Sequence, residues 1–185
     1  SGCGSAPSDQ RRASNGAPST VLRTVPLPVP GRNYGPRPMC VAAFAWQAHP
    51  RWRLVAIGNR DEYHARPAAA LAAWDSGIIA GRDLQSGGTW LGVGPAGRFA
   101  LVTNRRGFGE RAPDKASRGT LVGDLLTGTG AYADPQTAPL DDFNPFNLIL
   151  ADGRGAHFLS NRPETIRTTL VHGIYGLSNG ALDEP

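Results

Sequence analysis

The feature that most constrains the fold is a series of short apolar runs, each of strand length and separated from the next by turn-forming residues. Runs this short are typical of antiparallel strands rather than of helices. We predict strands at residues 40–46, 52–59, 77–83, 88–94, 98–104, 146–152, 155–161 and 168–179. One helix is predicted at residues 118–127, where Ser117 suits the N-cap and Gly128 the end. The chain is therefore of the α+β class, and either a two-sheet core with outer helices or a plain β-sandwich fits this pattern.

Several connections between these runs have the composition of turns. Pro50 interrupts the first connection, and the sequence DGRG at residues 152–155 is a strong hairpin signal. The segment GVGPAG at residues 92–97 matches the glycine pattern of dinucleotide-binding loops, but such a loop must open a helix. Here the segment leads directly into the apolar run at 98–104, so we interpret it as a hairpin turn.

Residues 1–38 differ in composition from the rest of the chain. They hold seven Pro, five Gly, five Ser and five Arg with a single acid, Asp9, so the net charge of +4 belongs to them. Such a segment buries too little apolar surface to fold, and we predict a disordered leader. Our hypothesis is that the natural protein begins at Met39. Residues 39–185 form the predicted domain, and because they end directly after a glycine-rich turn we expect a C-terminal part to be missing.

The charge and cysteine content of residues 39–185 argue against several classes of protein. Basic and acidic residues are equal in number there, so this part lacks the basic field that nucleic-acid binding requires. No apolar stretch is long enough for a signal peptide or an integral membrane segment. A single cysteine is typical of an intracellular protein with a free thiol, and we expect a cytoplasmic location. The histidines stand alone in the sequence, so no metal site is predicted.

Cys40 begins the first predicted strand, directly after Met39. A thiol with an ordinary pKa near 8.5 is mostly protonated at neutral pH and needs a base to act as a nucleophile. If Met39 were removed, the α-amine of Cys40 would supply that base on the same residue. The segment GNRDE ends the second predicted strand, and one hairpin turn would return it to Cys40.

The polar residues at the strand ends suit the chemistry of a hydrolase. Asp61 could orient the amine, and Arg60 could hold the thiolate or an anionic substrate group. Asn59 could donate a hydrogen bond to a developing oxyanion. Asn104 and Asn179 end two further strands in the same way. Because Asn and Asp are also ordinary turn residues at strand ends, only the combination carries weight.

Several motifs in the same order resemble the NRDE family, also called the Transport and Golgi organization protein 2 family. They are MC, GNRDE, AGRDLQSGGTWLGV, RFALVTNRR, SRGTLV and GIYGLSN, and they cover nearly all of residues 39–185. The resemblance implies an αββα sandwich of the N-terminal-nucleophile hydrolase type, truncated here at its C-terminus because family members usually continue further. By analogy with bile-salt and penicillin V acylases, it implies that Cys40 is nucleophile and base and that Asp61 orients the amine. Asn104 and Asn179 would then lie near the oxyanion.

The resemblance also implies functions that need no hydrolysis. Family members are associated with haem and acyl-coenzyme A, with lipid homeostasis and, in eukaryotes, with secretion and Golgi organisation. A groove lined by Trp90 and edged by Arg60, Arg82 and Arg105 could hold an apolar ligand with an anionic group. Equally, Trp90 could belong to the core and the arginines could pair with nearby acids.

Three functions therefore stay open. The first is a Cys-dependent amide or ester hydrolase, which requires no cofactor. The second is a non-catalytic carrier of haem or acyl-coenzyme A. In both, the partner is a small-molecule substrate or ligand. The third is a role in secretion and Golgi organisation as in eukaryotic relatives.

Overall fold

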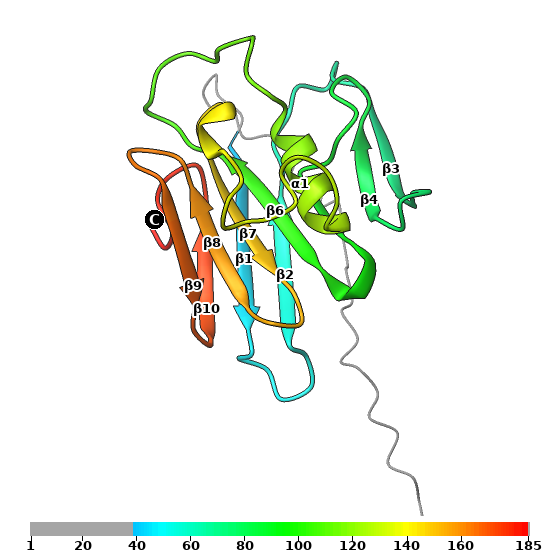
Figure 1. Cartoon of the computed structure of the whole chain (residues 1–185), viewed down its shortest axis with the longest axis vertical. Coiled ribbons are helices and arrows are strands. Elements are labelled where there is room, and N and C mark those ends of the chain that lie inside the picture. Colours follow the sequence, from blue (N-terminus) through cyan, green and yellow to red (C-terminus); the bar gives the residue numbers. More distant parts are fainter. Residues whose placement is uncertain (1–38, 185) are drawn as a thin grey trace, which may run out of the picture.

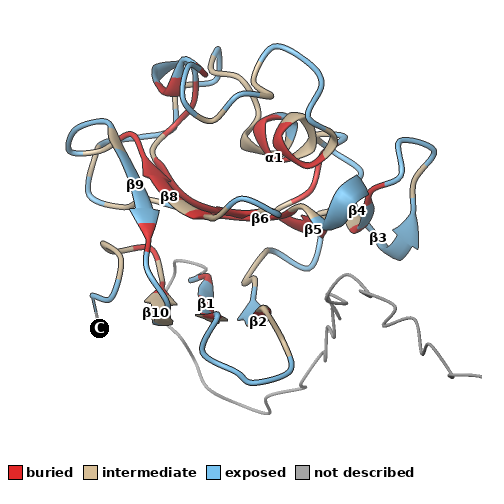
Figure 2. Cartoon of the chain, turned by 60° about the horizontal axis from the view of Figure 1, so that its bottom comes forward, coloured by how far each residue is buried: buried red, intermediate tan, exposed pale blue. Residues whose placement is uncertain are grey.

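The computed structural model describes residues 39–184, so the predicted leader at residues 1–38 lies outside the described residues. Two antiparallel sheets pack face to face, and one helix covers the outer face of the larger sheet (Figures 1 and 2). The smaller sheet has the order β10-β1-β2, formed by Gly173–Leu177, Val41–Trp46 and Leu54–Asn59. The larger sheet runs in chain order through β3 (Ala68–Ala73), β4 (Ile79–Asp83), β5 (Leu91–Val93), β6 (Phe99–Asn104), β7 (Phe146–Ala151), β8 (Ala156–Ser160) and β9 (Ile166–Leu170).

The smaller sheet has one buried and one exposed face, as the alternation along β1 requires. Ala42, Phe44 and Trp46 are buried and pack with residues of the larger sheet in one core cluster. The opposite face carries exposed apolar side chains, among them Ile57 at 66% and Ile174 at 75% exposure. The predicted hairpin of the first two strands is confirmed.

The central strands of the larger sheet are buried on both faces. All six residues of β7 are buried, and side chains from alternate positions enter two different core clusters. One cluster lies under α1 (Arg118–Thr127) and the other lies between the two sheets. Burial on both faces explains why residues 148–151 of β7 form a continuous apolar run rather than an alternating one.

The helix α1 has the bounds that its sequence predicts. The Ser117 hydroxyl accepts a hydrogen bond from the amide of Gly119 at 3.2 Å, which satisfies one of the free donors of the first turn. Gly128 adopts a left-handed conformation with φ of 72° and ends the helix. The buried face of the helix consists of Leu121, Val122, Leu125 and Leu126. No helix within residues 39–184 is long and apolar enough to cross a membrane.

Two glycines allow α1 to lie directly on the sheet. A Cβ atom on Gly88 would stand 2.5 Å from the carbonyl carbon of Gly119, at the start of the helix. A Cβ atom on Gly94 would overlap the carbonyl oxygen of Leu126, near the end of the helix. The backbones before and after β5 therefore touch the backbone of α1, and no residue larger than glycine fits at these positions.

The structure differs from the predicted strands in two places. The apolar run at residues 168–179 is divided, because β9 ends at Leu170 in the larger sheet and β10 begins at Gly173 in the smaller one. The strand β3 was absent from the prediction, since its sequence AAALAA has little β-propensity and all six of its residues are exposed. The turn interpretation of GVGPAG is confirmed, because residues 95–97 form a single 3₁₀ turn between β5 and β6.

The substitution Gly88→Ala is expected to destabilise the fold by about 1–3 kcal/mol, because the new methyl group would collide with the backbone of Gly119. Gly123→Ala is the matched control within α1, where a Cβ atom meets nothing within 4 Å. That control should be neutral or stabilise by up to about 1 kcal/mol through helix propensity. Urea unfolding of the two variants measures the difference, and equal stabilities would contradict the close approach.

Candidate functional site

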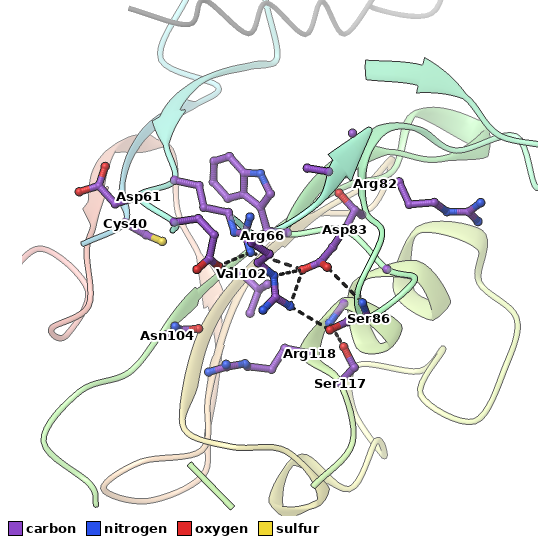
Figure 3. A pocket seen from close by; sticks show the side chains of 18 of the residues that line it. Cys40, Asp61, Arg66, Arg82, Asp83, Ser86, Val102, Asn104, Ser117 and Arg118 are labelled. Atoms are coloured by element: carbon purple, nitrogen blue, oxygen red, sulfur yellow. Dashed lines mark hydrogen bonds and ion pairs between the residues drawn. The ribbon is translucent and has the colours of Figure 1, made fainter. Parts of the chain in front are cut away.

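A cavity of about 380 Å³ opens where β1 begins and β2 ends (Figure 3). Its walls come from the loop after β2, from β4, from β6 and from the start of α1. The residues with chemical functions on these walls are Cys40, Arg60, Asp61, Glu62, Tyr63, Arg66, Arg82, Asp83, Ser86, Thr89, Trp90, Asn104, Arg111, Ser117, Arg118 and Asn144. The cavity thus collects residues from several of the motifs singled out in the sequence.

Cys40 is held at this cavity through its backbone nitrogen. The Cys40 N–H donates to the side-chain oxygen of Asn179 at 3.0 Å, across a separation of 139 residues. The amide nitrogen of the same Asn179 side chain donates to the backbone oxygen of Asn104 at 2.7 Å. Asn179 is buried, with 5% exposure, so it fixes the start of β1 against the end of β6.

Asp61 lies beside the same backbone segment. One of its carboxylate oxygens accepts the N–H of Met39 at 3.3 Å, and the other accepts the side-chain N–H of Asn59 at 2.7 Å. The return of the GNRDE segment to Cys40 is therefore confirmed. Asn59 itself does not line the cavity and instead positions the Asp61 carboxylate.

The remaining charged residues of the loop after β2 form an ion-pair network with β4. Arg60 contacts the Glu62 carboxylate at 2.7 Å and Asp83 at 3.4 Å. Arg66 contacts Asp83 at 2.7 Å and donates a hydrogen bond to the Ser86 hydroxyl at 2.9 Å. This network closes the wall of the cavity that faces Cys40 in Figure 3.

The surroundings of Cys40 oppose formation of a thiolate. Burial of the side chain, which is 8% exposed, raises the pKa of the thiol above its ordinary value. The charge of Arg60 and the backbone N–H of Asp61 lower that pKa but do not outweigh burial. No histidine lines the cavity, so the described residues around Cys40 include no neutral imidazole to serve as its base.

The other residues predicted as ligand contacts occupy different positions. Trp90 lines the cavity and also packs against both core clusters. Arg82 lines the cavity, but its guanidinium stacks over the ring of Trp74 at 4.3 Å and points away from Cys40 in Figure 3. Arg105 does not line the cavity and lies 3.5 Å from the carboxylate of Glu184.

Sequence reasoning did not identify Arg66, Asp83, Arg111 or Arg118 as site residues. Arg118 was assigned only to the start of a helix, and Asp83 stood beside Arg82 in a motif where only Arg82 and Trp90 were given roles. These residues come from loops that are far apart in the sequence and meet only in the folded protein, at one cavity. No sequence pattern therefore links them. Within residues 39–184, no three His, Cys, Asp or Glu side chains are grouped in a way that could hold a metal ion.

The comparisons with known proteins all point to one family. The sequence profile of the family described as Transport and Golgi organisation 2 matches residues 39–185. The Transport and Golgi organization protein 2 homolog of Bos taurus is 35% identical over 165 residues, which cover 80% of this chain and 59% of the relative. The homolog of Mus musculus is 33% identical over 164 residues, with the same coverage of each chain. Transport and Golgi organization protein 2 of Drosophila melanogaster is 28% identical over 169 residues. The chain spans about 59% of the length of the mammalian relatives.

The substitution Asp83→Asn should destabilise the fold by about 1.5–3 kcal/mol at neutral pH, because it removes the closer of the two carboxylates that pair with Arg66 and leaves only Glu62 at 3.7 Å. Burial raises the pKa of Asp83, but hydrogen bonds from Arg66 and from the amides of Ser86 and Gln85 outweigh it, and the net pKa lies below 3.8. The stabilisation is thus complete above about pH 4 and is lost as the pH falls through the lower pKa of the folded state.

Urea unfolding between pH 2 and 7 measures this contribution, and the difference between wild type and Asp83→Asn should shrink at acidic pH. The matched control is Asp141→Asn, whose carboxylate is 72% exposed in its ion pair with Arg162. That substitution should cost less than about 1 kcal/mol at any pH. Equal effects of the two substitutions would contradict the role of the network.

Cys40 should react slowly with iodoacetamide while Met39 is attached to it, because its pKa is raised. The alkylation rate should keep rising as the pH passes 9, without a plateau at lower pH. Arg60→Gln should slow the reaction further, since the Arg60 charge lowers the pKa of the thiol. Mass spectrometry of the Cys40 peptide follows the rate separately from Cys3, and a plateau below pH 8 would show that the thiol is activated.

Proposed function

The chain belongs to the Transport and Golgi organisation 2 family, and within that family we propose that it is a cysteine-dependent hydrolase of amide or ester bonds. Cys40 is the nucleophile. Its own α-amine, released by removal of Met39, is the base. The reaction requires no cofactor, because thiol, amine and hydrogen-bond donors carry out every step.

The observation that carries this proposal is the position of the Cys40 nitrogen. That nitrogen is bound by the Asn179 side chain, while Cys40 itself lines the cavity. Once Met39 is removed, the same nitrogen is the α-amine, and Asn179 still accepts one of its protons. The Asp61 carboxylate, which accepts the Met39 N–H in the longer chain, becomes available to the ammonium form. Two acceptors therefore orient the amine beside the thiol that it must deprotonate.

The proposed reaction passes through an acyl-enzyme. The Cys40 thiol gives its proton to the α-amine as sulfur attacks the carbonyl carbon of the substrate. The resulting ammonium returns that proton to the leaving amine or alcohol as the carbonyl re-forms, which leaves a thioester on Cys40. Water then attacks the thioester, with the amine again accepting and returning one proton, and the acid and the free thiol are released.

Asn104 is the proposed donor to the oxyanion. Its backbone oxygen is fixed by Asn179, and its side chain lines the cavity (Figure 3). Among residues 39–184, no group forms a hydrogen bond with the Asn104 side-chain amide, so its N–H donors are available to a substrate. Removing one donor to an oxyanion typically lowers kcat by about 10²–10³-fold.

The layers of the fold support the αββα type for the whole protein. Helix α1 and the two sheets give the order helix, sheet, sheet, and the first strand of the smaller sheet follows the nucleophile. A second helical layer in that architecture would lie on the outer face of the smaller sheet, where Ile57 and Ile174 are exposed. A free thiol as nucleophile also favours a reducing compartment, so we propose a cytoplasmic location.

The second candidate is a non-catalytic carrier of haem or acyl-coenzyme A. The burial of Cys40 and the raised pKa of its thiol favour this candidate as long as Met39 stays attached. In that case the cavity binds its ligand and Cys40 is a small buried side chain. A role in transport and Golgi organisation, which the names of the relatives state, is supported for this chain only by its membership of the family.

The decisive experiment compares the full-length natural protein in two forms, one beginning at Cys40 and one in which Met39 still precedes it. Both are incubated with a panel of acyl p-nitrophenyl esters and acyl p-nitroanilides. The form beginning at Cys40 should hydrolyse at least one of them about 10²-fold faster or more, since it alone carries the base. Intact mass spectrometry should show the acyl group on Cys40.

Cys40→Ala should abolish this activity in the processed form, and Asn104→Ala should lower kcat by about 10²-fold. Arg51→Gln in the processed form is the matched control and should change nothing, because Arg51 is exposed and does not line the cavity. Equal and negligible hydrolysis by the two forms would overturn the hydrolase. Retained binding of haem or an acyl thioester by Cys40→Ala would then favour the carrier.

A further inference from the structure

Two arginines of the cavity have no carboxylate to balance them. The lining contains five arginines and three acidic residues, and the ion-pair network with β4 accounts for two of each. Arg82 stacks on an indole ring, and Asp61 is engaged near the start of β1. The excess positive charge therefore lies with Arg111, in the loop before α1, and with Arg118, the first residue of that helix.

The position of Arg118 is unfavourable for its positive charge. It is the first residue of α1, where a cation opposes the helix dipole. Its guanidinium donates to the backbone oxygen of Pro145 at 3.0 Å, and no carboxylate within residues 39–184 forms an ion pair with it. Burial, together with repulsion by Arg111, lowers the pKa of Arg118 to about 10. A position this unfavourable for a cation becomes favourable when an anion binds beside it.

Arg111 stands at the rim of the same cavity. Its side chain is exposed, and it forms no ion pair with any residue of the described part of the chain. It lies close enough to Arg118 for their like charges to interact. Two guanidinium groups on one wall, each with free donors, match the geometry by which proteins hold carboxylate or phosphate groups.

We propose that Arg111 and Arg118 form a subsite for an anionic group of the substrate, a carboxylate or a phosphate, while Cys40 faces the bond to be cleaved. This inference rests on the proposed function, because it names the substrate class of that reaction. The substrate is an acyl compound whose apolar part contacts Trp90 and Val102 and whose charged end lies at α1. Neutral esters and amides of the same size should be hydrolysed more slowly than those that carry an anionic end.

The test measures binding without turnover. The full-length natural protein carrying Cys40→Ser is titrated with inorganic phosphate and, separately, with hexanoate by calorimetry at low ionic strength. At least one of the two anions should bind. The anion with the lower Kd shows whether the charged group of the substrate is a phosphate or a carboxylate. Arg111→Gln and Arg118→Gln should each raise the Kd about tenfold or more. Arg51→Gln is the matched control, since Arg51 is exposed in the turn between β1 and β2 and does not line the cavity.

Arg111→Gln keeps the test decisive if Arg118→Gln unfolds, because Arg111 makes no contact that the fold needs. Absence of binding by both anions, or equal weakening by Arg51→Gln, would overturn the subsite. The result for the anion subsite can be distinguished from the result for hydrolysis. Anion binding that is lost in Arg111→Gln supports the subsite, and it overturns the hydrolase if the form beginning at Cys40, with its cysteine intact, hydrolyses no ester or anilide. If the form beginning at Cys40 hydrolyses esters that carry an anionic end, and Arg111→Gln leaves that hydrolysis unchanged, the hydrolase is supported and the subsite is overturned.

Discussion

The Asn179 side chain is the interaction on which the arrangement of the cavity depends. One amide group joins the nitrogen of Cys40, at the start of the smaller sheet, to the backbone of Asn104, at the end of β6 in the larger sheet. The neighbouring Thr103 hydroxyl donates to the oxygen of Ser178, which strengthens the same junction. A buried amide with both of its ends bonded holds its position closely, so the two sheets meet in a fixed relation at the site.

The two walls of the cavity differ in their balance of charge. On the wall near β4, arginines and acids neutralise one another and give rigidity to the loop after β2. On the wall near α1, the arginines are unbalanced, and the close contact of Gly88 with Gly119 brings the start of the helix directly against the backbone before β5. A site with one balanced and one unbalanced wall favours ligands that bring a negative charge to a defined end.

The sequence predicted local structure well and the charge distribution of the site poorly. The helix bounds followed from Ser117 and Gly128, and the hairpin that returns GNRDE to Cys40 followed from two runs of strand length with Pro50 between them. The strand β3 was missed because a run of alanines is held in an edge strand only by pairing with β4. The unbalanced arginines could not be found, because their lack of partners depends on which loops meet in space.

The pairing of β1 with β10 also sets the order of folding events. Ala42 pairs with Leu177, so almost the whole domain lies between the two strands that meet at the site. Contacts between such distant residues require closure of a long loop, and they form late compared with local hairpins and helices. The hydrogen bond from the Cys40 N–H to the Asn179 side chain is therefore expected to form among the last contacts. A chain that is only partly folded already has its hairpins but not yet the assembled cysteine site.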